Sequence, residues 1–329
     1  MATNADSQFR LTFPVGKSDF SIGYQDNILS IGSCFAENVA ERLSQSRLHV
    51  TVNPFGILYN PLSISSALHI LATGQRFAGA DLFYSENLYH SWMHHSRFSR
   101  AEQQECLDAI NSSIDAVDLS KVTTLVVTLG TAWVYELKET GRVVANCHKQ
   151  SPDLFRRRRI SVDEAVDALG GAISELRALN SDMKIILTVS PVRHFKDGAH
   201  ENTLSKATLH LAVDRLCETF GCDYFPAYEL LVDDLRDYRF YADDMAHPSP
   251  VAVDYVFSAF CERYFTAPTA TLAADVRKLT RSLSHRPLTS DENYKSFLKS
   301  LLSKFQSFAS QHKEVDLSGD ISDLNKRIE

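Results

Sequence analysis

Three polar residues, far apart in the sequence, are of the types that a nucleophilic hydrolase needs. Ser33 follows a short apolar run, Asn27–Ile31, at the point where the pattern changes to helical spacing. Asp244 and His247 are three residues apart late in the chain, so they share one face of a turn. A serine hydroxyl attacks an ester only when a base takes its proton; histidine is the usual base, and a carboxylate orients it. These residues predict nucleophilic catalysis at Ser33.

A second set of polar residues follows the predicted strands, where an open parallel sheet binds its ligands. These residues are Asn53, Gly56, Gly130, Thr131, Ser190, Arg193 and His194. We expect Arg193 and His194 to contact the substrate or an acyl oxygen, and a buried salt bridge is the alternative. Cys34 is a rival nucleophile if the start of a helix lowers the pKa of its thiol. Asp243 is a rival to Asp244.

The elements that position these residues alternate between strand and helix. The apolar runs at 122–129 and 184–189 are typical of strands covered on both faces. A capping box from Ser161 to Glu164 opens the helix between them, and Gly221 ends a later amphipathic helix at 204–220. Shorter strands are expected at 48–52 and 223–228. The alternation predicts an α/β fold with a parallel sheet between helix layers, over residues 20–265.

Two regions depart from this alternation. Residues 81–119 contain no expected strand and are rich in aromatic residues and histidine, so we interpret them as an insertion over one end of the sheet. From residue 267 the pattern is helical, and its apolar stripe is expected to form core or a dimer face. The last dozen residues are polar and are expected to fray. The predicted domains are 1–265 and a helical extension at 266–329.

Composition excludes several classes of protein. The 329 residues include 34 basic and 41 acidic side chains, a net charge of −7, which argues against binding to nucleic acid or an anionic membrane. The longest apolar runs are too short to span a bilayer, and the first residues lack the pattern of a secretory signal. Six scattered cysteines are typical of reduced thiols in a cytoplasmic protein. No glycine-rich nucleotide loop occurs.

Histidine and arginine clusters have simpler interpretations than ligand binding. His90, His94 and His95 have a spacing that a metal could use, but no carboxylate or cysteine set accompanies them. We expect them to line a pocket or pack the insertion. His148, beside Cys147, is instead expected to contact the substrate or to form a buried salt bridge, like Arg193 and His194. The four consecutive arginines at 156–159 indicate a solvated face, with an anionic substrate or partner as the alternative.

Several short motifs together resemble one family. The segment Gly32-Ser33-Cys34-Phe35-Ala36 spells the signature after which the GSCFA family is named. Further stretches similar to that family are Asn53-Pro-Phe-Gly56, Thr128-Leu-Gly-Thr131, Asn146-Cys-His-Lys149, Ser190-Pro-Val-Arg-His194 and Tyr238-Arg-Phe-Tyr241 with Asp244-x-x-His247-Pro-Ser249. The motifs extend from about residue 28 to residue 260.

The GSCFA family is in turn similar to the SGNH, or GDSL-like, hydrolases. This resemblance implies a three-layer α/β/α fold with a flavodoxin-like sheet, Ser33 as the nucleophile and Gly56 as an oxyanion donor. Asp244 and His247 would complete the triad. The block at Gly130 and Thr131 lacks the asparagine of those hydrolases, so Thr131, Asn53 or a backbone N–H would replace it.

These observations predict a serine hydrolase that cleaves an O-acyl or O-acetyl ester on a sugar or small molecule, with no metal or cofactor. An acyltransferase using the same triad and a catalytically weak binding or assembly module are the alternatives. The C-terminal helices are a candidate surface for a homo-oligomer. The prediction requires Ser33 and His247 to meet at one sheet edge, within hydrogen-bonding reach, with the hydroxyl open to solvent.

Overall fold

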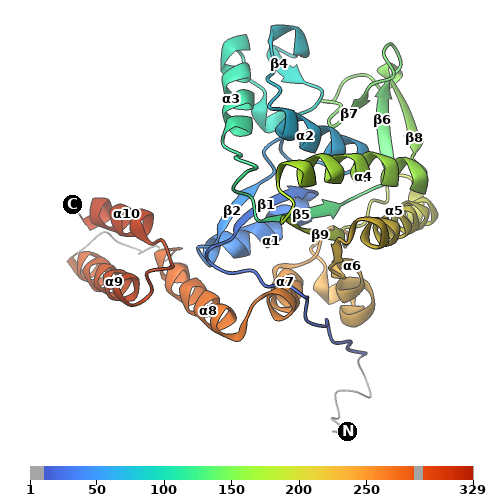
Figure 1. The fold of residues 1–329 in the computed structure, drawn as a ribbon. Coiled ribbons are helices and arrows are strands. Elements are labelled where there is room, and N and C mark those ends of the chain that lie inside the picture. The colour runs from blue at the N-terminus through green and yellow to red at the C-terminus, as the bar shows by residue number, and fades with distance from the viewer. Residues whose placement is uncertain (1–10, 285–291, 329) are drawn as a thin grey trace.

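A five-stranded parallel sheet forms the centre of the computed structural model, which describes residues 11–284 and 292–328 (Figure 1). Its order is β2-β1-β5-β9-β10, which is the flavodoxin-like order when the five strands are counted along the chain. The strands are β1 (Asn27–Gly32), β2 (His49–Val52), β5 (Thr124–Leu129), β9 (Lys184–Val189) and β10 (Asp223–Tyr224). The predicted strands are therefore present, although β10 is shorter than expected because Pro226 follows it.

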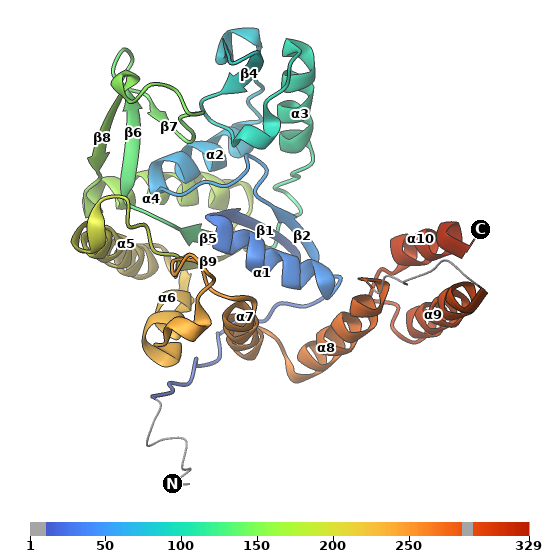
Figure 2. The same ribbon diagram turned by 180° about the vertical axis from the view of Figure 1, so that it is seen from behind.

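Helices cover both faces of this sheet, so the fold is a three-layer α/β/α sandwich, as predicted (Figures 1 and 2). Alternate strand residues face opposite layers: Leu29 and Leu125 pack with the first layer, and Ile28 and Val126 with the second. The first layer consists of α2 (Pro61–Thr73), α4 (Val162–Leu179) and α5 (Gly198–Phe220). The second contains α1 (Cys34–Gln45) and α7 (Pro250–Tyr264).

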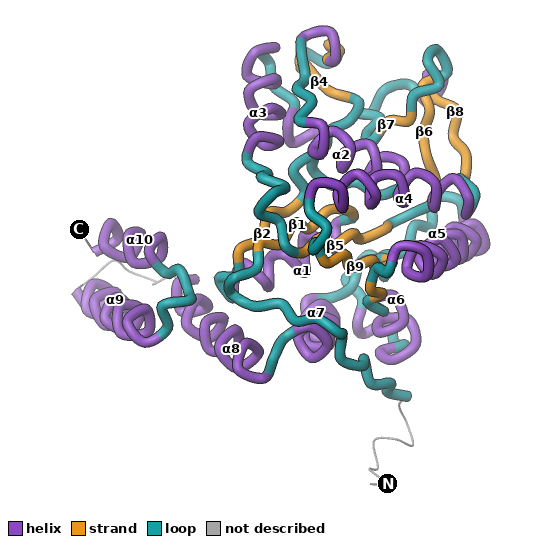
Figure 3. Tube along the Cα trace, in the orientation of Figure 1, coloured by secondary structure: helices purple, strands orange, loops and turns teal. Residues whose placement is uncertain are grey.

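Two small antiparallel sheets are separate from the central sheet and lie above it in the view of Figure 3. One is a hairpin of β3 (Leu82–Ser85) and β4 (Leu88–Ser91), followed by α3 (Gln103–Asp115). The expectation of no strand within residues 81–119 is therefore wrong. The other sheet joins β6 (Trp133–Leu137), β7 (Val143–Val144) and β8 (Phe155–Arg159), and the sequence analysis did not predict it.

The remaining helices follow the sheet. They are α6 (Ala227–Glu229), α8 (Ala267–Arg281), α9 (Glu292–Gln311) and α10 (Ser318–Ile328). The end of the chain is not frayed over 318–328, because Leu324 of α10 is fully buried and Asp320 pairs with Arg47. The apolar stripe of α9 packs in the same core cluster as α1 and α7, as Leu298 and Phe305 illustrate. An oligomer through these helices stays a prediction. No described helix is at once long and apolar enough to cross a membrane.

Candidate active site

Ser33 lies in the turn between β1 and α1, where the sequence predicted it. It is the N-cap of α1, and its Oγ accepts a hydrogen bond from the N–H of Phe35 at 3.3 Å. Its own N–H donates to the carbonyl of Thr128, at the end of β5, at 3.0 Å. Gly32 permits this close approach, because its φ is +141° and a Cβ at this position would collide with the same carbonyl. The pair Gly32-Ser33 thus joins the ends of β1 and β5.

This turn lies at the switch point of the sheet. The strand order reverses between β1 and β5, and open α/β sheets bind ligands in the crevice at such a point. Gly130 directly follows β5, and a Cβ built on it would lie 3.3 Å from the Cβ of Ser33 and 3.2 Å from the ring of Tyr59. Ser33, Gly130 and Tyr59 are therefore packed together at the carboxyl edge.

The Ser33 side chain is completely buried, with an exposed fraction of 0%. A hydroxyl that projects from the sheet into solvent was expected, and this expectation is wrong for the conformation described. The reason is tertiary packing, since Gly130 and Tyr59 come from other segments and close over the turn. In this conformation the Ser33 hydroxyl is not accessible from solvent.

The side chains of Asp244 and His247 are joined by a direct hydrogen bond. The Nδ1 atom of His247 lies 2.6 Å from Oδ2 of Asp244, and the hydrogen bond selects Asp244 over Asp243. The other carboxylate oxygen accepts the backbone N–H groups of Ala246 and His247, both at 2.9 Å. These backbone and side-chain hydrogen bonds lower the pKa of Asp244 to about 2. The carboxylate is therefore ionised at neutral pH and fixed in orientation, while the side chains of both residues are about half exposed.

In the described part of the chain, no hydrogen bond joins His247 to Ser33. His247 instead acts on His194, because burial, Lys206 and His247 together lower the pKa of His194. The N–H of Arg193 also donates to the carbonyl of Ala246 at 3.3 Å. The late loop thus contacts the loop that follows β9.

Two of the expected oxyanion residues already have partners within the protein. The N–H of Gly56 donates to the carbonyl of Asn53 at 2.7 Å. The side chain of Asn53 is buried; it accepts the N–H of Gly32 at 2.8 Å and donates to Glu37 at 3.2 Å. In this conformation Asn53 and Gly56 hold the loop after β2 against the Ser33 turn, and the backbone N–H of Gly56 is not a free donor.

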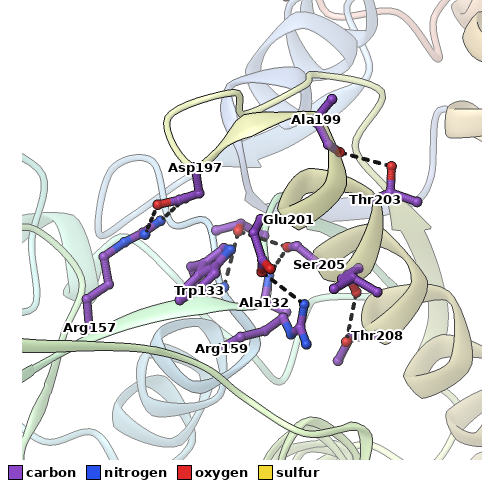
Figure 4. Close-up of polar contacts among 12 residues, drawn as sticks. Ala132, Trp133, Arg157, Arg159, Asp197, Ala199, Glu201, Thr203, Ser205 and Thr208 are labelled. Carbon is purple, nitrogen blue, oxygen red and sulfur yellow. Dashed lines mark hydrogen bonds and ion pairs between the residues drawn. The ribbon is translucent and has the colours of Figure 1, made fainter.

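The block after β5 is occupied in the same way. The N–H groups of Gly130 and Thr131 both donate to the carbonyl of Tyr59, at 2.8 and 2.9 Å. The hydroxyl of Thr131 lies 3.1 Å from that of Ser205 and accepts the N–H of Trp133 at 3.1 Å (Figure 4 draws this region). Thr131 therefore organises the chain between β5 and β6, and it is not a free substitute for an oxyanion asparagine.

Arg193 and His194 lie after β9, as predicted. Within the described part of the chain, neither residue forms the buried salt bridge that was the alternative. The ring of His194 packs edge-on against Tyr59 at 5.6 Å, and its Nε2 atom is buried without a hydrogen-bond partner. Burial, Lys206 and His247 lower the pKa of His194 to about 4, so its imidazole is neutral at pH 7. The guanidinium of Arg193 lies 5.2 Å from the ring centroid of Phe195.

A buried cation, Lys206, was missed by the sequence analysis. Its Nζ donates to the carbonyl of Gly130 at 2.8 Å and to that of Ser190 at 2.6 Å, so it ties the ends of β5 and β9 together. Burial lowers its pKa to about 7. The signal was available, because Lys206 stands three residues before Leu209 and seven before Val213, on the apolar face of α5.

A cavity of about 400 Å³ opens beside this edge, and we call it the β6–β8 cavity. Its lining residues include Tyr59 and Thr131, which lie next to the Ser33 turn and Gly130, and residues of the small β6–β8 sheet and of the loop after β9. Its volume is typical of small-molecule sites. The lining residues include Tyr59, Thr131, Trp133, Tyr135, Arg157, His194, Lys196 and Asp197.

The four consecutive arginines form strand β8, and each is paired with a carboxylate. Arg156 and Arg158 contact Glu136 of β6, and Arg158 also contacts Glu164. On the alternate face, Arg157 pairs with Asp197 and Arg159 with Glu201 (Figure 4). The run is therefore a strand held on both faces by ion pairs, and its side chains are not simply solvated.

The histidines of the insertion pack together with aromatic rings. His94 is buried against Phe55 and Phe77, and burial, His148 and Arg97 lower its pKa to about 3. The rings of His90 and His148 lie 4.6 Å apart, and both histidines bond to serines or serine carbonyls. Within residues 11–284 and 292–328, no group of three or more potential ligands is placed to hold a metal ion.

Cys34, the rival nucleophile, is partly exposed, whereas Ser33 is not. Burial and the nearby charge of Glu37 raise the pKa of its thiol above the ordinary value. The thiol therefore stays protonated at neutral pH, and the start of α1 does not activate it.

No curated protein matches the sequence. A solved structure with no protein named matches with a TM-score of 0.36 and 15% identity, over 73% of this chain and 95% of its own. An acetyl xylan esterase (Est2A) from the rumen bacterium Butyrivibrio proteoclasticus matches with a TM-score of 0.34 and 12% identity, over 75% of this chain and 61% of its own. Likenesses this distant are not evidence of a shared activity.

Two family models cover most of the sequence. Residues 276–329 match the model described as "GSCFA domain protein, C-terminal domain", a range that begins within α8 and includes α9 and α10. Residues 27–260 match the GSCFA family model, from the start of β1 into α7, and thus include both the Ser33 turn and the Asp244–His247 pair. Because this match extends over well more than half of the 329 residues, the chain belongs to the GSCFA family.

Proposed function

We propose that this protein is a serine hydrolase that cleaves an ester, an O-acyl or O-acetyl group on a sugar or small molecule. The observation that carries the proposal is the 2.6 Å bond from His247 to Asp244, which gives an exposed imidazole the carboxylate partner of a general base. The position of Ser33 at the switch point of the sheet supports its role as nucleophile.

In the proposed cycle, His247 takes the proton of Ser33 while its Oγ attacks the ester carbonyl. The tetrahedral intermediate collapses, and His247 returns the proton to the leaving alcohol. Water then attacks the acyl group on Ser33 with His247 again as the base, which releases the acid and restores the hydroxyl. Asp244 holds the imidazole in one tautomer and stabilises its charged form throughout.

The cycle requires a change around Ser33. Ser33, which is completely buried beside Gly130 and Tyr59, must become accessible and must come within hydrogen-bonding distance of His247. The N–H of Cys34 is the proposed oxyanion donor, because it belongs to the first residue of α1 and helix N-termini stabilise negative charge.

The test compares two N-cap substitutions. Ser33→Ala should lower kcat for a chromogenic short-chain ester by about 10,000-fold or more. Ser161→Ala is the matched control, since Ser161 caps α4 with a 3.1 Å bond and lies outside the proposed site. Both variants should lose about 1 kcal/mol of stability. Equal turnover by the two variants would refute the role of Ser33.

A second function, ligand binding without turnover, is favoured by two observations. Ser33 has an exposed fraction of 0%, and the N–H groups of Gly56, Gly130 and Thr131 already donate within the protein. A binding module would bind its ligand while neither hydrolysing esters nor transferring the acyl group. Product analysis with added alcohols separates the enzymatic choices, because free acid alone indicates hydrolysis and a new ester indicates acyl transfer.

A further inference from the structure

The charges around the β6–β8 cavity do not cancel. The residues that line it include two basic side chains, Arg157 and Lys196, and one acidic side chain, Asp197. Both oxygens of Asp197 accept hydrogen bonds from the guanidinium of Arg157. The ammonium of Lys196 donates to the neutral hydroxyl of Tyr135 at 2.9 Å. With the nearby histidines neutral, the cavity keeps one positive charge, although the chain as a whole has a net charge of −7.

The unpartnered polar atoms of the same residues are mainly donors. Nε1 of Trp133 and Nε of Arg157 are buried without a hydrogen-bond partner, and neither atom can accept a hydrogen bond. Nε2 of His194 is also unpartnered. Leaving such groups unpaired costs free energy, which an acceptor-rich ligand that shifts the walls slightly would recover.

Aromatic rings define the shape of the cavity. The guanidinium of Arg157 lies 4.2 Å from the ring centroid of Trp133 and 5.3 Å from that of Tyr135, so both rings and the ion pair form one block. Figure 4 shows Arg157 and Asp197 facing each other beside Trp133. A small ligand in the cavity would meet a rigid aromatic wall with basic groups along it.

We propose that the β6–β8 cavity binds a small molecule through a carboxylate group, with Lys196 and Arg157 as its basic contacts. Asp197 occupies two of the guanidinium donors in the free protein and so competes with the incoming carboxylate. The biological role of this cavity rests on the proposed function. If both hold, the substrate is an ester that carries one carboxylate and binds beside Thr131 and the Ser33 turn.

The first test measures binding alone, so it does not depend on catalysis. The probes are D-glucuronate and other small hydroxy-carboxylates, each compared by calorimetry with its neutral amide, for which D-glucuronamide is the partner of D-glucuronate. The carboxylates should bind at least about 10-fold more tightly than the amides. Hydrogen bonds to a charged group contribute more binding free energy than those to a neutral group, and the difference corresponds to about this change in affinity. Equal affinity within every pair would overturn the proposal.

Variants of the ion pair give opposite signs. Lys196→Gln should weaken carboxylate binding about 10-fold and leave amide binding unchanged, while Lys196→Arg restores it. Asp197→Asn should strengthen carboxylate binding, because it removes the negative charge and one of the two acceptor oxygens that compete for the guanidinium of Arg157. Glu201→Gln is the matched control: Glu201 pairs with Arg159 at 3.2 Å on the same face of β8 but does not line the cavity.

Circular dichroism of each variant verifies the fold. The proposal is wrong if Asp197→Asn weakens carboxylate binding. It is also wrong if the control Glu201→Gln strengthens carboxylate binding as much as Asp197→Asn does. The two proposals can fail independently. Carboxylate binding with no reaction at Ser33 would support the proposed ligand of the β6–β8 cavity and contradict the proposed hydrolase. Hydrolysis at Ser33 with no preference for carboxylates would do the reverse.

Discussion

The imidazole Nδ1 of His247 lies 2.6 Å from Oδ2 of Asp244, and the remaining oxygen of that carboxylate accepts two backbone N–H groups. With Nδ1 engaged, the proton of the neutral imidazole belongs on that nitrogen, and Nε2 is the atom left to exchange a proton with a hydroxyl. Among the residues that the structure describes, no hydrogen bond joins His247 to Ser33.

Asp244→Asn tests the pairing. An amide at this position holds the imidazole in the wrong tautomer, so kcat should fall by about 1,000- to 10,000-fold with the fold intact. Asp243→Asn is the control, because Asp243 is the exposed neighbour and the hydrogen bond goes to Asp244. Similar ester turnover by both variants would show that Asp244 does not orient the base.

Gly32→Ala tests the geometry of the Ser33 turn. The φ of +141° and the collision of a Cβ with the Thr128 carbonyl should separate β1 from β5 and cost about 3 kcal/mol or more. Gly74→Ala is matched to it, since Gly74 has a φ of +65° and open space around it, so only about 1 kcal/mol of backbone strain is expected. Urea unfolding measures both, and equal losses would mean that the close contact is not required.

Lys206→Met tests the buried cation through pH. The pKa of Lys206 in the folded protein, about 7, is below that of an unfolded lysine, so between these values the unfolded chain holds a proton that the folded chain lacks. Wild-type stability should therefore rise relative to Lys206→Met from about pH 7 to about pH 10. Unfolding free energies of both proteins across that range give the difference, and parallel curves would contradict the expectation.

The central fold was predictable because local patterns agree with the tertiary arrangement. The runs at β5 and β9 are apolar on both faces, and the capping box at Ser161 and the left-handed Gly221 mark helix ends that the structure confirms. Alternation of strands and helices then leaves few topologies.

The β6–β8 sheet was missed because its signal is not hydrophobic. The run at 156–159 is charged throughout and shows no alternation of apolar and polar residues, and in the strand its side chains pair with carboxylates from separate segments, such as Glu136 and Asp197. Such partners lie about 20 to 40 positions away in the chain, beyond the reach of local periodicity.

The state of Ser33 could not be predicted for a similar reason. Its place in the turn follows from Gly32 and the helical spacing after it, but its burial depends on Tyr59 and Gly130. The pairing of Asp244 with His247 is local, so a spacing of three residues was enough to indicate it.

Reaction with a fluorophosphonate probe, followed by mass spectrometry of the peptides, tests the central claim most directly. We expect a covalent adduct on Ser33 of the wild-type protein that disappears in Ser33→Ala and persists in Cys34→Ala. Labelling should be slow, because the hydroxyl is covered in the conformation described. The absence of any adduct, or an adduct on Cys34 or another residue that survives in Ser33→Ala, would contradict the account.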